Sequence, residues 1–119
     1  MDADTLRAML ARHFEHGSHE MYVEDATLEF PQSGERFEGI ENLHPWRSEY
    51  PADTSFEIGE IRGSGDHWVA EVTVSYDGGP PNFGVSILEF RGEKIARETI
   101  YVTEAFEAPV WRAQWRSAP

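Results

Sequence analysis

The chain has 119 residues, with 22 acidic side chains against 10 Lys and Arg, a formal net charge of -12 and no cysteine. This length predicts one domain over residues 1–119 with a single hydrophobic core. The lack of cysteine excludes a disulfide framework, a thiolate metal site and a cysteine nucleophile. The negative charge opposes binding to nucleic acid or to an anionic membrane, because both carry phosphate. No apolar run approaches the roughly 18 residues that cross a bilayer, and the acidic start is unlike a signal peptide, so we expect a soluble cytoplasmic protein.

The N-terminal part of the chain predicts helices and two short strands. Apolar residues spaced three and four apart between Leu6 and Phe14 indicate an amphipathic first helix, which Gly17 ends. Shorter elements are then expected in this order: a second helical segment over residues 19–24, strands over 26–30 and 36–38, and a third helix over 40–50 that Pro45 disturbs.

The second half predicts four strands, over residues 54–62, 67–76, 82–91 and 94–103. Short glycine-rich loops separate them, which is typical of an antiparallel meander. Helices followed by long, curling strands predict an α+β fold, with the N-terminal helices packed on the concave face of a cone-shaped antiparallel sheet. The tail after residue 105 carries Trp111 and Trp115 at helical spacing, and we expect it to dock on the body or on a partner.

Glu98 is the most unusual residue of the last strand. Alternation places it between Ala96 and Ile100 on the more apolar face, where an ionised carboxylate is costly to bury. A carboxyl group in a partly dry cavity is one way in which proteins prepare acid–base chemistry. The alternatives are a structural ion pair or a strand with the opposite register, and the sequence alone leaves these interpretations open.

The strand over residues 82–91 is apolar on both faces, so we expect both to be covered. Helices can cover only one of them, and a second copy of the chain covers the other most simply. The face left for that copy carries the residues expected at a homodimer interface, namely Glu71, Glu89, Arg97 and Tyr101.

Several stretches, taken in order, resemble a known family. These are residues 21–31, 34–39, 85–90 and 97–101, with the tail residues 106–112. Together they are similar to the SnoaL-like branch of the nuclear-transport-factor-like superfamily, although the region joining the first two helices is shorter here. The resemblance implies a cone of three helices and a curved sheet around an apolar pocket, with dimerisation through the sheet. The short connection also favours exchange of the first helix between subunits.

The family includes ketosteroid isomerases, and their pocket positions can be carried over by the resemblance. The catalytic base of the isomerases falls on Phe30, which makes that route unsuitable here, and their protonated acid falls on Ser86. One pocket tyrosine is retained as Tyr22, a second corresponds to Arg47, and an apolar position on the last strand corresponds to Glu98.

We therefore expect Glu98, Arg47, Tyr22 and His19 to form the catalytic group. Glu98 or His19 would accept a proton, Tyr22 would polarise an oxygen and Arg47 would hold an anionic group. His19 and Tyr22 would share one helical face. The alternative is that Arg47 and Glu98 form a buried ion pair and that Tyr22 is a core residue.

The pocket wall is expected to include Phe30, Trp46, Tyr76, Ser86, Leu28, Val72 and Ile100. No metal site is predicted, because Gly17 interrupts the helical spacing of the nearby histidines. No nucleotide-binding motif is present, so no cofactor is expected. The sequence thus predicts a cofactor-free acid–base enzyme that isomerises, dehydrates, cyclises or hydrolyses a small, largely apolar molecule. A ligand-binding domain without activity and a dimeric protein-interaction module are the alternatives.

Overall fold

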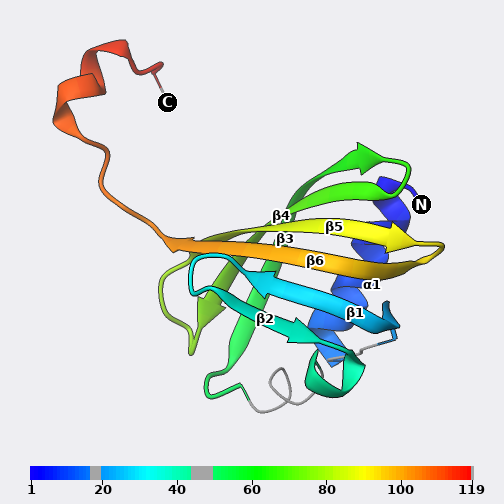
Figure 1. The fold of residues 1–119 in the computed structure, drawn as a ribbon. Coiled ribbons are helices and arrows are strands. Elements are labelled where there is room, and N and C mark those ends of the chain that lie inside the picture. The colour runs from blue at the N-terminus through cyan, green and yellow to red at the C-terminus, as the bar shows by residue number, and fades with distance from the viewer. Residues whose placement is uncertain (17–19, 44–49, 119) are drawn as a thin grey trace.

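The protein folds as one curved sheet with a helix packed against its inner face (Figure 1). The structure, a computed structural model, describes residues 1–16, 20–43 and 50–118. In chain order the elements are α1 (Ala3–His16), β1 (Tyr22–Phe30), β2 (Glu35–Glu38), β3 (Thr54–Ser64), β4 (His67–Tyr76), β5 (Asn82–Arg91), β6 (Lys94–Glu104) and the 3-10 helix η1 (Val110–Trp115). The strand order is β2-β1-β6-β5-β4-β3, which confirms the predicted α+β class.

The sheet consists of two antiparallel parts that meet at a parallel pair. Strands β3 to β6 form the predicted antiparallel meander, and β1 and β2 form a separate hairpin. Strand β1 then pairs in parallel with β6, which completes the sheet. The short loops predict the antiparallel neighbours, whereas the parallel pair joins strands that are far apart in the sequence.

Strand β1 begins at Tyr22, so the helical segment predicted over residues 19–24 is wrong in the part that the structure describes. Tyr22 lies beside Ile95 of β6, and both side chains are almost completely buried. The Ile95 backbone N–H also donates to the carbonyl oxygen of Met21 at 2.8 Å. Pairing with β6 therefore overrides the local helical signal. Residues 17–19 lie outside the described range.

Helix α1 forms as predicted and supplies one side of the core. Asp2 caps its first turn, where the Thr5 backbone N–H donates to the carboxylate at 2.8 Å. This hydrogen bond lowers the pKa of Asp2 from its ordinary value. The helix buries Leu6, Leu10 and His13 against the inner face of the sheet. Within the described residues, no helix has the length and apolar character needed to cross a bilayer.

An irregularity in β6 decides which side chains face inward. Leu88 of β5 lies opposite Glu98, but Phe90 lies opposite Ile95, so β6 contains one more residue than β5 over this stretch. Such a bulge changes the alternation of side chains on either side of it. Ile95 and Glu98 are consequently both buried, although simple alternation would place them on opposite faces of the strand.

Two further segments differ from the simple expectation. The third helix begins at Ile40 as predicted, but residues 44–49 lie outside the described range and Tyr50 is not helical. The tail does not dock on the part of the body that the structure describes: it leaves the end of β6 and extends away from the sheet (Figure 1). Its docking on a partner stays a prediction.

Candidate functional site

A cavity of about 240 Å³ lies on the inner side of the sheet, beside the C-terminal half of α1. Two aromatic pairs form much of its wall. Phe14 of α1 stacks on Phe56 of β3 with ring centres 4.1 Å apart, and Tyr50 stacks on Tyr76 at 5.8 Å. The remaining lining residues are His13, Phe30, Thr54, Val72, Val74, Gly84, Val85, Ser86, Glu98, Ile100 and Val102. The cavity is therefore largely apolar, with a few polar groups, as small-molecule sites usually are.

Glu98 provides the carboxylate of this cavity. Its side chain is only 3% exposed, and its neighbours across the strands, Leu28 and Leu88, are fully buried. The Tyr22 hydroxyl donates a hydrogen bond to Glu98 Oε1. A hydrogen bond to an ionised acceptor is stronger than one between neutral groups, and it offsets part of the desolvation penalty of the buried carboxylate.

His13 completes a group of three polar side chains that come from three different elements. It is buried on the inner face of α1 and lines the cavity. Its ring centre lies 6.0 Å from that of Tyr22, and the two rings are nearly perpendicular, at 80°. The fold thus gathers His13 from α1, Tyr22 from β1 and Glu98 from β6 on one side of the cavity.

Sequence reasoning missed His13 as a candidate. It placed the residue on the apolar face of the first helix and weighed it, with the nearby histidines, only as a metal ligand, without an acid–base role. The available signal was its position three residues after Leu10, which requires an imidazole to be buried on the face that packs against the sheet. A buried titratable ring such as that of His13, close to a strand with an inward carboxylate, is typical of functional sites.

The structure brings together some of the predicted site residues and separates others. Phe30, Tyr76, Ser86, Val72 and Ile100 line the cavity together with Glu98. Leu28 is instead fully buried in the core, and the described lining does not include it.

The catalytic roles predicted for Tyr22 and His19 assumed that Tyr22 lies in a helix. Because Tyr22 lies in β1, the helical face proposed for His19 and Tyr22 is wrong. Tyr22 contacts Glu98 rather than lining the cavity, so its geometry favours positioning the carboxylate. His19, Trp46 and Arg47 lie outside the described residues.

Tyr76 keeps its proton across the neutral range. Burial, together with hydrogen bonding to Tyr50, raises the pKa of Tyr76 to about 12. Its hydroxyl at the cavity wall is thus a neutral group that can donate to a ligand oxygen.

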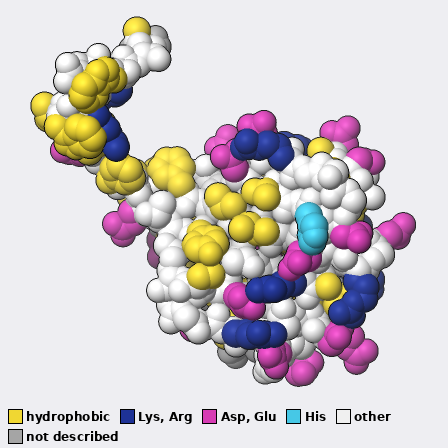
Figure 2. All heavy atoms as spheres, turned by 45° about the horizontal axis from the view of Figure 1, so that its top comes forward, with side chains coloured by type: hydrophobic (Ala, Val, Ile, Leu, Met, Phe, Trp, Pro, Cys, Tyr) yellow, Lys and Arg dark blue, Asp and Glu magenta, His cyan; other side chains and the backbone are white. Residues whose placement is uncertain are grey.

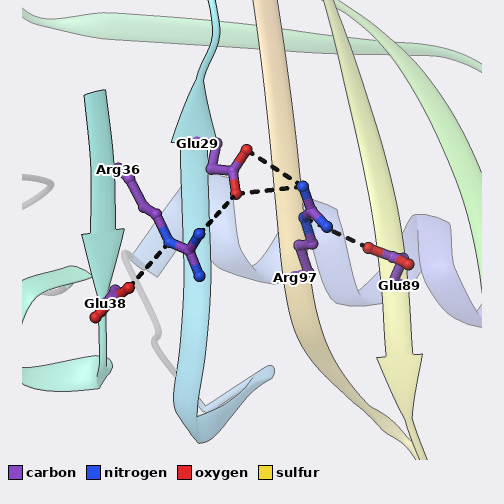
Figure 3. Close-up of polar contacts among 5 residues, drawn as sticks. All are labelled: Glu29, Arg36, Glu38, Glu89 and Arg97. Atoms are coloured by element: carbon purple, nitrogen blue, oxygen red, sulfur yellow. Dashed lines mark hydrogen bonds and ion pairs between the residues drawn. The ribbon is translucent and has the colours of Figure 1, made fainter. Parts of the chain in front are cut away.

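The outer face of the sheet carries a chain of ion pairs (Figure 3). Arg97 lies between Glu29, at 3.2 Å, and Glu89, at 3.6 Å. Arg36 lies 3.6 Å from Glu29 and 3.0 Å from Glu38. The pairs cross β2, β1, β6 and β5, but exposed pairs of this kind each contribute little to stability. Arg97 and Glu89, which are expected at a dimer interface, are therefore already partnered within one chain.

The described residues include no group of three or more His, Asp or Glu side chains arranged to hold a metal ion. The acids and histidines that they contain are either dispersed over the surface or, like His13 and Glu98, part of the cavity wall.

Comparison with solved structures gives close matches over almost the whole chain. A protein of unknown function from Burkholderia xenovorans LB400, described as NTF-2 like, is 39% identical, with a TM-score of 0.84, over 98% of this chain and 96% of the other. A provisionally assigned ketosteroid isomerase from Kribbella flavida is 24% identical, with a TM-score of 0.80, over 98% and 90%. A provisionally assigned polyketide cyclase from Sinorhizobium meliloti is 22% identical, with a TM-score of 0.67, over 85% and 100%.

No curated protein matches the chain significantly. The sequence profile of the SnoaL-like domain, however, matches residues 3–98. This range includes α1, strands β1 to β5 and the first part of β6, with Glu98 as its last residue. The resemblance inferred from the sequence is thereby confirmed, and the chain belongs to the SnoaL-like domain family.

Proposed function

We propose that the protein is a cofactor-free acid–base enzyme that acts on a small, largely apolar organic molecule. The observation that carries this proposal is Glu98, a carboxylate buried on an apolar cavity wall and held there by the Tyr22 hydroxyl. Nothing in the packing of a leucine-lined strand requires an acid at this place. Carboxylates in such surroundings are found where a proton is transferred.

Glu98 is the proton acceptor in this proposal. Its carboxylate takes a proton from carbon or oxygen of the bound molecule, while Tyr22 fixes its orientation. His13, on the same cavity, returns a proton to a second atom of that molecule. When His13 protonates a different atom, the substrate is isomerised, and when it protonates a leaving hydroxyl group, water is released and the substrate is dehydrated. When Glu98 instead deprotonates a water molecule, the hydroxide attacks the substrate, and His13 protonates the group that leaves. In each case Glu98 then releases its proton to solvent and His13 regains one from solvent.

The cavity wall supports a flat, apolar substrate with at least one oxygen. The aromatic pairs Phe14–Phe56 and Tyr50–Tyr76 offer ring faces to such a molecule, and Ser86 and Tyr76 offer hydroxyl groups to its oxygen. The neighbours assigned provisionally as a ketosteroid isomerase and a polyketide cyclase share the fold, and both names refer to chemistry on carbonyl compounds. We extend this substrate class, small enolisable carbonyl compounds, to the present chain as part of the proposal.

Hydrogen–deuterium exchange at carbon tests the proposal and does not require the product to be identified. A panel of small cyclic and aromatic ketones is incubated with the protein in deuterated water, and exchange next to the carbonyl group is followed by NMR. We expect catalysed exchange for some members, and its loss in Glu98→Gln and His13→Gln. Absence of exchange across the panel, or exchange that survives both substitutions, would contradict the proposal.

A further inference from the structure

The last part of the chain is an apolar segment that does not pack on the described part of its own body. Residues 105–118, here called the C-terminal arm, continue from β6 and extend away from the sheet (Figure 1). Trp111 and Trp115 are each 71% exposed, and Phe106 and Val110 are exposed as well. Side chains of this size rarely stay in water on a monomeric protein, and tryptophan is among the residues enriched at protein interfaces.

The outer face of the sheet offers a matching surface. Phe83, Ile87 and Tyr101 are exposed there, with Phe83 51% exposed. A groove on this face is lined by Gln32, Gly59, Glu71, Val72, Thr73, Phe83, Gly84, Val85, Tyr101, Val102 and Thr103. Figure 2 shows hydrophobic side chains gathered on the body next to the base of the arm, with charged side chains beside them. The groove lies on the apolar part of the face, whereas the ion pairs of Arg97 lie at the opposite end of β5 and β6.

The arm and the groove also differ in charge. The arm carries Arg112 and Arg116 against a single acid, Glu107, although the whole chain has a net charge of -12. Glu71 lines the groove, where it also pairs with Arg62 at 2.7 Å, and exposed Glu57 lies opposite Thr73, another lining residue. A basic, aromatic segment is therefore attached to an acidic body whose groove combines aromatic rings with carboxylates.

We propose that the C-terminal arm docks in the outer-face groove of a second copy of the chain, and that the exchange is reciprocal. The indoles of Trp111 and Trp115 occupy the groove beside Phe83 and Tyr101, and the arm arginines face its carboxylates. A surface that holds both an arm and a groove is self-complementary, which is the condition for a closed two-fold dimer.

The geometry favours a second copy over the arm's own body. Residues 105–109 are not part of a helix or strand, and Pro109 has φ -60° and ψ 136°, an extended conformation that carries η1 outward. The chain leaves β6 next to Thr103, which itself lines the groove, so the arm would have to reverse direction at once to reach it. A neighbouring copy meets the arm without such a reversal.

Sedimentation velocity over a range of protein concentrations tests the proposal on the full chain. We expect a dimer, and a dissociation constant at least about 30-fold weaker in the double variant Trp111→Ser/Trp115→Ser, as for interface hot spots. The matched control is Gln114→Ser/Ser117→Ala, which changes two exposed residues of the same arm and should leave the dimer unchanged. Higher salt should weaken association of the unmodified chain, because the charges involved are exposed.

Mixing two variants separates arm exchange from any other dimer. The double tryptophan variant keeps an intact groove, and Phe83→Ser keeps an intact arm. Each alone should be largely monomeric, while their mixture should form a heterodimer with one native arm-in-groove contact. The proposal would be overturned if the unmodified chain is monomeric or if the double tryptophan variant dimerises as tightly as the unmodified chain. It would also be overturned if the mixture associates no more tightly than each variant alone.

Discussion

Glu98 occupies a position whose strand neighbours, Leu28 and Leu88, are fully buried leucines. The carboxylate is tolerated there because the Tyr22 hydroxyl donates to it. The inward direction of Glu98 was accessible from strand alternation, since Glu98 interrupts an apolar face. The partner was not, because the local pattern placed Tyr22 in a helix and gave no indication that its strand would pair with β6.

The hydrogen bond between Tyr22 and Glu98 should be measurable in stability. Tyr22→Phe removes a hydrogen bond to a buried carboxylate, so we expect the free energy of unfolding to fall by about 1–3 kcal/mol. Urea unfolding followed by circular dichroism measures the change. The control is Ser64→Ala, which removes an exposed hydroxyl outside the groove and should cost less than about 0.5 kcal/mol. Equal stability of Tyr22→Phe and the unmodified chain would contradict this role.

Tyr76 makes a prediction about alkaline pH. Its pKa is about 12 in the folded protein against 10.0 for an ordinary tyrosine, because burial disfavours the phenolate. The folded state therefore holds the proton more tightly than the unfolded state, and stability should fall as the pH rises from 10 towards 12. Tyr76→Phe should show a shallower fall over this window in urea unfolding. An identical pH dependence in both proteins would show that Tyr76 ionises normally.

At the scale of elements, two features of β6 create the site. Its parallel pairing with β1 brings Tyr22 to the inner face, and its bulge turns both Ile95 and Glu98 inward. Hairpins were predictable because their short glycine-rich loops leave few alternatives. The parallel pair and the bulge were not, because both depend on contacts between strands that are distant in sequence.

The hairpin between β3 and β4 requires glycine at one position of its turn but not at another. A Cβ added at Gly63 would lie 2.3 Å from the His67 carbonyl oxygen and 2.7 Å from Trp68 Cα, whereas one at Gly65 would meet nothing within 4 Å. Gly63→Ala should therefore lower the melting temperature far more than Gly65→Ala, which bears only the strain of a positive φ, roughly 1 kcal/mol. Thermal unfolding of the pair tests this, and equal losses would show that the hairpin can shift to accept a side chain.

At the scale of the whole molecule, the two faces of the sheet do different work. The inner face forms the cavity, and the outer face carries the ion pairs and the groove. The net charge of -12 reflects mainly the solvated surface. As a sum over the whole chain, it gives no indication that Glu98 lies on the cavity wall or that the arm is basic. Composition and strand alternation could predict the fold class and most of the cavity wall. They could not predict that the arm extends away from the body, because the spacing of its apolar residues is equally typical of a segment that packs on the body.

The most direct test of the central claim is the rate of carbon-bound deuterium exchange by Glu98→Gln relative to the unmodified protein. The substrate is the ketone that the unmodified protein exchanges fastest, at a concentration that saturates both proteins. Glu93→Gln, in the exposed turn between β5 and β6, is the matched control and should keep the full rate. If Glu98 is the proton acceptor, its replacement should lower the rate by about 10²–10⁴-fold while binding persists. A Glu98→Gln protein that binds and exchanges at the unmodified rate would contradict the account.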